Sequence, residues 1–292
     1  MKLGYWVYKI ARGGARATGI AGLLRATLGP SVAQFIFNRT TGAGKATVVN
    51  GHRMVLAEDG QYPPFAMATD KYEVGTTRLL ENVIKPGMVV VDIGAHVGYF
   101  TLLAARQVGT EGRVYSFEPE PTNFRLLQEN IKANGYQNVL ATQKAVSDAA
   151  GSAQLVLSSR DNGTHSLFGH STSEENIVSV KVTSLDEFLT GEGWPKVDFI
   201  KMDVEGAEMK AFEGMKRVLK GFPEVKLVME FNPALLRNAS VDPADFLNKP
   251  SEFGFSISVI EDPDGTKPLD ASSLTAELLN SEGSVNLYCH RI

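Results

Sequence analysis

The chain has 292 residues, of which 43% are hydrophobic and 21% charged, and its formal net charge is −4. This length allows one large domain, or one domain with an extension, and the hydrophobic content is ample for a sizeable core. The single cysteine, Cys289, excludes an internal disulfide, and no cluster of cysteine and histidine has the spacing of a zinc site. These features are typical of an enzyme from a reducing compartment, and we expect a cytoplasmic location.

Residues 1–45 form a basic segment at the start of the chain. No Asp or Glu occurs before Glu58, whereas eight Lys or Arg residues do. No uncharged apolar stretch approaches the ~20 residues needed to span a bilayer, and Arg12 and Arg16 interrupt any secretory signal. We expect a helical arm that packs on the domain or on a second subunit; a helix lying on an anionic membrane surface is the alternative. No nucleic acid partner is expected, because a basic tail alone does not specify one.

Residues 46–87 are expected to form a hairpin and a helix that lead into the core. Two strand-like runs flank Asn50-Gly51, the dipeptide most typical of a two-residue hairpin turn. Asp70–Val83 then has a helical pattern.

Strands and helices alternate from residue 88 to residue 292, the range predicted to be the main domain. This alternation predicts an α/β fold with a mostly parallel sheet and helices on both faces. The expected strands lie at 88–93, 113–117, 138–143, 197–202, 225–230, 255–260 and 284–290. The expected helices lie at 98–107, 121–134, 206–220 and 243–252.

The most informative segment is Val89–Thr101, with the sequence VVVDIGAHVGYFT. It reads as a buried strand, a glycine-spaced turn and the start of a helix. Gly94 and Gly98 allow the backbone to approach a ligand, and amides at the helix start can hold a polar group. Asp92 adds a negative charge, which suits a ligand with ammonium and sulfonium groups better than a pyrophosphate. The spacing D-x-G-x-x-x-G also differs from that of dinucleotide folds, and together these features indicate S-adenosylmethionine.

A second carboxylate supports an adenosine-type ligand. Glu118 stands at the end of the strand Arg113–Phe117, one helix and one strand after Asp92. An acid at that place in a doubly wound sheet accepts hydrogen bonds from ribose hydroxyls. The alternative is that Glu118 is merely a solvated strand end.

A polar insertion, Ser158–Asn176, interrupts the alternation. It contains His165 and lies between two strand-like runs, Ala153–Leu157 and Ile177–Val182. A long polar loop inside a compact domain is often functional, so the insertion is a candidate substrate lid. A surface loop without function is the alternative.

The third motif is FIKMDVEGAE at Phe199–Glu208, which places three acids just after a strand. Asp203 is expected near the transferred group, because the end of this strand faces the reactive end of the ligand. Glu205 and Glu208 also fit a purely structural role, since acids in the first turn of a helix interact favourably with its dipole. The corresponding structural role for Asp203 is that of a helix N-cap, which an Asp side chain also fills.

The ordered motifs DIGAHVGYFT, FEPEPTNF, KAVSD, IKMDVEGAE and MEFNP resemble those of FkbM-type methyltransferases, over a range from Glu73 to the C-terminus. The resemblance implies a class I, Rossmann-like methyltransferase fold with a mostly parallel seven-stranded sheet, preceded here by a helical and hairpin extension. It also implies methylation of a hydroxyl oxygen on a sugar, glycolipid, polyketide or other small molecule. The residues assigned to the cofactor by this comparison and by their place beside the motifs are Glu73, Asp92, Gly94, His96, Gly98, Tyr99, Glu118, Pro119, Ala145 and Val146.

Methylation of an alcohol requires alignment of the acceptor and removal of its proton. Asp203 is the preferred catalytic residue, with Glu230 or His165 as the alternative. The acids Asp203, Glu205 and Glu230 could instead hold a magnesium or calcium ion, as in catechol-type enzymes, but nothing in their spacing singles out a metal, so no metal site is predicted. A nicotinamide-dependent oxidoreductase and a non-catalytic, membrane-docked cofactor-binding module are the remaining alternatives.

Overall fold

The computed structural model describes residues 46–56, 67, 72–157, 165–167, 176–261, 265–269, 278–281 and 283–291. It divides into two compact units, at residues 1–72 and 73–292. The basic segment 1–45 and most of the insertion 158–176 lie outside the described residues, and the predicted domain boundaries after residues 45 and 87 stay predictions. Within the described part of the chain, no helix has the length and apolarity to cross a membrane.

The first unit contains the predicted hairpin. Strands β1 (Ala46–Val49) and β2 (His52–Val55) pair antiparallel, with Val49 opposite His52. Asn50 and Gly51 both have positive φ, as a two-residue turn between twisted strands requires.

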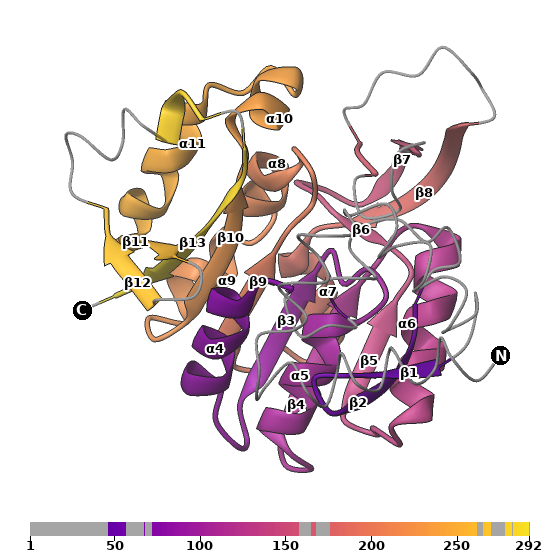
Figure 1. Cartoon of the computed structure of the whole chain (residues 1–292). Helices are drawn as coiled ribbons and strands as arrows, with labels where there is room; N and C mark the ends of the chain where they lie inside the picture. The colour runs from indigo at the N-terminus through magenta and orange to yellow at the C-terminus, as the bar shows by residue number, and fades with distance from the viewer. Residues whose placement is uncertain are drawn as a thin grey trace, which may run out of the picture. The chain divides into compact units, whose positions relative to one another are not determined.

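The second unit is built on an eight-stranded sheet with the order β12-β11-β13-β10-β9-β3-β4-β5 (Figure 1). All seven predicted strands are present in it, and β12 adds an eighth at one edge. The five strands from β10 to β5 run parallel, whereas β13, β11 and β12 pair antiparallel. The strands are β3 (Val89–Ile93), β4 (Arg113–Phe117), β5 (Val139–Thr142), β9 (Phe199–Met202), β10 (Lys226–Phe231), β11 (Ser256–Glu261), β12 (Gly265–Pro268) and β13 (Val285–His290).

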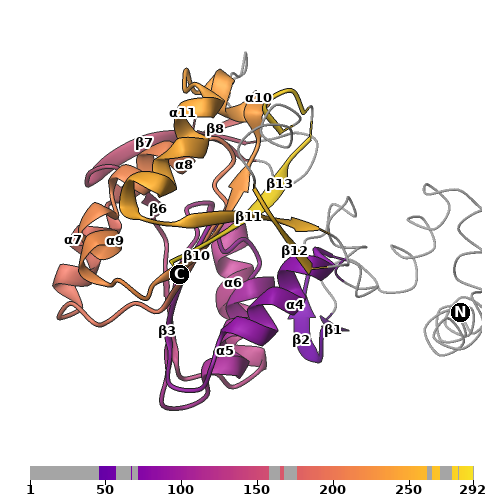
Figure 2. The ribbon, with the colours of Figure 1, turned by 90° about the vertical axis from the view of Figure 1, so that its left-hand side faces the viewer.

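Helices cover both faces of this sheet, as the sequence predicts. Figure 2 shows α4, α5 and α6 on one side and α7 and α9 on the other. Large apolar side chains from the strands, among them Phe117, Phe199 and Phe231, are fully buried beneath them. The helical segments are α4 (Val74–Val83), α5 (Tyr99–Val108), α6 (Pro121–Ala133), α7 (Leu185–Gly191), α8 (Glu208–Glu213), α9 (Lys216–Gly221), α10 (Pro233–Asn238), α11 (Pro243–Asn248) and the 3₁₀ helix η2 (Lys249–Phe253).

A separate three-stranded sheet follows β5. Its order is β6-β8-β7, formed by Ala145–Val146, Ile177–Thr183 and Gly151–Val156. Ala145 and Val146, which the resemblance assigns to the cofactor, lie beyond the third core strand, which ends at Thr142, and they pair with β8. The strand-like runs on either side of the insertion are thus its antiparallel pair, β7 and β8.

The single helix predicted at 206–220 is two short helices. The chain breaks at Gly214, where a Cβ atom would lie 1.9 Å from the carbonyl oxygen of Ser147. The close approach of these two backbones ends α8, and α9 begins at Lys216. Two further helices escaped prediction although they carry caps: Ser184 accepts a hydrogen bond from the amide of Glu187, and Asn232 caps α10.

Candidate active site

Asp92 lies in β3, where the residue is 2% exposed. Its Oδ2 accepts a hydrogen bond of 2.6 Å from the hydroxyl of Thr101 in α5, which lies 2.9 Å from the hydroxyl of Ser116 in β4. Its Oδ1 is buried and has no hydrogen-bond partner among the described residues. Burial raises the pKa of Asp92, and the charge of Lys201 partly offsets this effect. One orphaned acceptor therefore remains for a donor or cation from a ligand.

The glycines of the turn after β3 are required by the protein's own packing. Gly94 has φ of 81°, and a Cβ atom there would lie 1.8 Å from the carbonyl oxygen of Asp203. Gly98 has φ of 98°, and a Cβ atom there would lie 2.8 Å from Cδ1 of Leu127. Protein atoms thus lie where side chains at these two positions would be, and the approach of a ligand to the glycine backbone stays a prediction.

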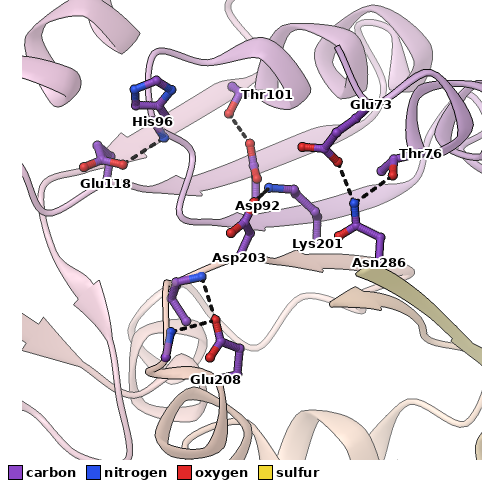
Figure 3. A network of polar contacts seen from close by, with 12 residues as sticks. Glu73, Thr76, Asp92, His96, Thr101, Glu118, Lys201, Asp203, Glu208 and Asn286 are labelled. Carbon is purple, nitrogen blue, oxygen red and sulfur yellow. Dashed lines mark hydrogen bonds and ion pairs between the residues drawn. The ribbon is translucent and has the colours of Figure 1, made fainter. Parts of the chain in front are cut away.

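Glu118 is held at the end of β4 by two backbone amides. The amide of His96 donates to its Oε2 at 2.8 Å (Figure 3). The amide of Glu120 donates to its Oε1 at 2.9 Å. His96 adopts φ of 51°, unusual for a residue with a side chain, and this conformation aims its amide at the carboxylate. Burial raises the pKa of Glu118 to about 8 despite these hydrogen bonds. The fixed carboxylate has further lone pairs for hydroxyl donors.

Lys201 connects the cofactor side of the site with the acid-rich loop, residues 203–207 after β9. It is 3% exposed, stands opposite Asp92 in the β3–β9 register, and forms a 3.0 Å ion pair with Oδ2 of Asp203 (Figure 3). Burial alone would lower the pKa of Lys201, but the charges of Asp203, Asp92 and Glu73 raise it above its usual value. Its ammonium group also lies 4.8 Å from the ring centre of Phe100. The lysine is therefore a fixed cation and a poor proton acceptor.

Three carboxylates meet beside this ion pair. One oxygen from each of Asp203, Glu205 and Glu230 lies within 4.8 Å of the others. Asp203 directly follows β9, Glu205 lies in the next turn with φ of 51°, and Glu230 lies near the end of the adjacent strand β10. The predicted catalytic carboxylates Asp203 and Glu230 are thus brought together.

The surroundings of Glu230 perturb its carboxyl group. Burial and the charges of Asp203, Glu205 and Glu208 raise the pKa of Glu230 well above its usual value. Its Oε2 is buried and has no hydrogen-bond partner among the described residues. Burial also raises the pKa of Glu208, to about 7, but this carboxylate accepts hydrogen bonds from the amides of Val204 and Gly206 and shapes the loop.

Glu73, assigned to the cofactor on sequence resemblance, is held by a distant strand. The side-chain amide of Asn286 in β13 donates to Oε2 of Glu73 at 2.7 Å and contacts the hydroxyl of Thr76 at 3.0 Å (Figure 3). Asn286 stands opposite Glu230 in the β10–β13 register. This contact joins the segment before the core to the acid-rich end of the sheet, and no local sequence pattern predicts it.

One described part of the insertion reaches the same loop. The hydroxyl of Ser166 donates a 2.6 Å hydrogen bond to the carbonyl oxygen of Glu205, and Ser166 also bridges to Val156 in β7. His165, the predicted alternative base, directly precedes this contact and is partly buried. The insertion therefore touches the acid-rich loop at Ser166, and the lid role of this segment stays a prediction.

The remaining predicted cofactor residues differ in surroundings. The hydroxyl of Tyr99 lies 3.1 Å from that of Thr77 in α4, so this side chain joins two helices. Pro119 is partly buried beside Glu118. Ala145 and Val146 are buried in β6.

Lys201 is the residue whose role sequence reasoning missed; its signal was a lysine within a strand that is otherwise apolar.

A family model described as the methyltransferase FkbM domain matches residues 92–257. The chain is 29% identical to the hexuronic acid methyltransferase AglP of Haloferax volcanii over 189 residues, which cover 64% of this chain and 71% of that protein. It is 28% identical to Methyltransferase 1 of Beauveria bassiana, over 43% of this chain and 57% of the relative, less than two thirds of its length. Among solved structures, an S-adenosylmethionine-dependent O-methyltransferase of Thermotoga maritima matches with a TM-score of 0.44 and 12% identity, over 88% of this chain and 81% of that one.

Proposed function

Because the chain belongs to the FkbM family of methyltransferases, we propose that it methylates a hydroxyl oxygen of a sugar or a similar polyhydroxylated small molecule. S-adenosylmethionine is the cofactor, and it supplies an activated methyl group on a sulfonium centre. The family assignment replaces the nicotinamide-dependent alternative, whose glycine spacing the sequence also lacks.

The residues around the β3 turn fit this cofactor. The orphaned Oδ1 of Asp92 offers an acceptor for the ammonium group of the methionine portion. The carboxylate of Glu118, oriented by two amides, offers acceptors for ribose hydroxyls. These contacts orient the cofactor with its sulfonium end toward Asp203, because β3 and β9 are neighbours in the sheet.

The acceptor side is proposed to be the acid cluster of Asp203, Glu205 and Glu230. Carboxylates accept hydrogen bonds from hydroxyl groups, and a positioned carboxylate holds an attacking oxygen in line with the methyl group. Asp203, fixed by Lys201, is proposed to orient the acceptor, and Glu230 is proposed to assist loss of the hydroxyl proton. His165 remains the alternative base, through its position beside Ser166.

The single observation that carries the proposal is this convergence of the acid cluster beside the buried Lys201–Asp203 ion pair. The sugar class of the acceptor is supported by the name of the H. volcanii relative, a hexuronic acid methyltransferase. An acid-rich surface repels a free carboxylate, so we expect neutral glycosides to be better acceptors for this chain than uronic acids.

The experiment is an assay for S-adenosylhomocysteine release by the full chain with a panel of neutral glycosides, with mass spectrometry of the methylated product. Asp203→Asn is expected to lower turnover about 10²–10⁴-fold, while changing the Kd for S-adenosylmethionine far less. Glu224→Gln is the matched control, because Glu224 is an exposed acid with a side chain 80% accessible. Methylation at nitrogen or carbon, or Asp203→Asn turning over as fast as Glu224→Gln, would contradict the proposal.

A further inference from the structure

We propose that Thr101 and Ser116, the hydroxyl pair, are positioning residues of the cofactor site: they hold the carboxylate of Asp92 so that its Oδ1 is left for the ammonium group of S-adenosylmethionine. The hydrogen bonds of the hydroxyl pair belong to the folded chain itself. Their effect on binding rests on the proposed function, in which Asp92 accepts a hydrogen bond from that ammonium group.

The hydroxyl pair and Asp92 come from three neighbouring elements. Asp92 in β3 and Ser116 in β4 are partners in the parallel register, so their side chains lie on the same face of the sheet. Thr101 lies in the first turn of α5, the helix that follows the β3 turn, and its hydroxyl reaches Asp92 (Figure 3). The exposed fraction is 2% for Asp92 and 0% for both members of the pair. Three polar groups are therefore gathered inside the domain.

The direction of each hydrogen bond follows from the number of protons available. A threonine hydroxyl has one proton, and Thr101 donates it to Oδ2 of Asp92 at 2.6 Å. The oxygen of Thr101 can then only accept, so the hydroxyl of Ser116, 2.9 Å away, is the donor in the second bond. Both protons thus point toward Asp92, and each bond polarises the next. The length of 2.6 Å also falls in the range of hydrogen bonds from a hydroxyl to an ionised carboxylate, about 2.5–2.7 Å.

The two carboxylate oxygens of Asp92 consequently have different surroundings. Oδ2 is occupied by Thr101, whereas Oδ1 is buried and has no hydrogen-bond partner in the described part of the chain. Burial raises the pKa of Asp92, and the charge of Lys201 and hydrogen bonding by Thr101 act in the opposite direction. Lys201 itself is paired with Oδ2 of Asp203. The hydroxyl pair thus favours the ionised carboxylate and fixes its rotation, which leaves Oδ1 for a cationic donor.

A purely structural role, in which the hydroxyl pair joins α5 to the sheet, is the alternative. Valine has nearly the shape of threonine and would fill the same space without a hydroxyl group to desolvate. The two roles differ in what they predict for a chain without the charge of Asp92. A structural contribution of Thr101 persists in such a chain, whereas a contribution that acts through Asp92 disappears.

The test is calorimetric titration of the full chain with S-adenosylmethionine, without an acceptor. Thr101→Val should weaken binding about tenfold, because a hydrogen bond to a charged group is lost. Thr101→Ser keeps the hydroxyl and should bind within about twofold of the parent. Ser116→Ala should weaken binding less, by about two- to threefold, because it acts only through Thr101. Ser258→Ala is its matched control and should bind as the parent does, because Ser258 is also buried in a strand, β11, which β13, β10 and β9 separate from β3.

A double-mutant cycle with Asp92→Asn separates the two roles. In the Asp92→Asn background, Thr101→Val should change the Kd for S-adenosylmethionine by less than about twofold, because the charge that Thr101 supports is gone. Thermal unfolding of each variant shows whether it is folded. If Thr101→Val does not fold, Ser116→Ala takes its place in the cycle and should have no effect in the Asp92→Asn background.

The outcomes separate this inference from the proposed function. Parental affinity in folded Thr101→Val and Ser116→Ala, or an equal loss with and without the charge of Asp92, overturns the positioning role; weaker binding by Asp92→Asn then still supports the ammonium contact of the proposed function. Parental affinity in Asp92→Asn overturns that contact and the positioning role together. Failure of every glycoside to be methylated removes the proposed acceptor and leaves the role of the hydroxyl pair standing, because the titration uses no acceptor.

Discussion

Gly94→Ala should be among the most damaging conservative changes in the chain. The new Cβ atom would lie 1.8 Å from the carbonyl oxygen of Asp203, whereas contacts below about 3.0 Å are not tolerated. The turn after β3 and the loop after β9 must therefore separate by more than 1 Å, which is an overpacking penalty of about 1–3 kcal/mol. The positive φ of 81° adds about 1–2 kcal/mol for a residue with a side chain.

Gly87→Ala is the matched control, because it isolates the clash from the backbone penalty. Gly87 has φ of 83°, and no atom lies within 4 Å of the position its Cβ would take. Both variants thus share the left-handed penalty, and only Gly94→Ala also displaces Asp203. Urea unfolding should give Gly94→Ala a free energy of unfolding about 1–3 kcal/mol below that of Gly87→Ala.

Calorimetric titration with S-adenosylmethionine completes this comparison. Gly87→Ala should bind the cofactor as the parent does, and Gly94→Ala should bind it at least tenfold more weakly, because Asp92 and Asp203 lie on either side of the displaced turn. Equal stability of the two variants, or parental cofactor affinity in Gly94→Ala, would refute the inferred approach of the two loops.

Three further predictions concern the cofactor site and the basic segment. The pKa of Glu118 is raised to about 8 in the folded chain and is about 4.5 in the unfolded chain, so between these values the folded state keeps a proton that the unfolded state has lost, and the free energy of unfolding should fall as pH rises from about 5 to 8. Chemical unfolding of Glu118→Gln across this range should show a smaller fall. An unchanged dependence of the free energy of unfolding on pH would contradict the assignment. Asp92→Asn should weaken S-adenosylmethionine binding about tenfold or more by calorimetry, since hydrogen bonds to charged groups contribute roughly 1.5–3 kcal/mol; parental affinity would exclude the ammonium contact. Deletion of residues 1–44 should leave the affinity for S-adenosylmethionine intact. Salt-sensitive binding to anionic liposomes that the parent chain shows and the deletion variant lacks would favour a membrane role over a packing role for the arm.

The predicted sheet accounts for much of the candidate site. Strand periodicity placed the ends of β3, β9 and β10, and parallel strands bring their carboxyl ends to one edge. The register then follows, since Asp92 pairs with Lys201 and Met202 with Met229, which puts Asp203 and Glu230 side by side. The proximity of these two acids was therefore within reach of sequence reasoning.

Other features depend on contacts that no local pattern encodes. The bond between Asn286 and Glu73 joins residues 213 positions apart and exists only because β13 pairs with β10. The reason for a glycine at position 94 lies in the backbone of Asp203, and the hydrogen bond from Ser166 to Glu205 crosses from an insertion. The position of each depends on tertiary packing, so a one-dimensional pattern of hydrophobic and polar residues does not reveal it.

The place of β13 has a consequence for the order in which the molecule is made. This strand, Val285–His290, lies between β10 and β11, which the ribosome releases earlier. Until β13 emerges, β10 and β11 have no partner at these edges, and unpaired strand edges in an incomplete chain promote aggregation. Asn286, which reaches Glu73 and stands opposite Glu230, arrives with the same strand. We therefore expect the acid-rich end of the sheet to assemble only after β13 is released, in a slow step dominated by contacts between distant residues.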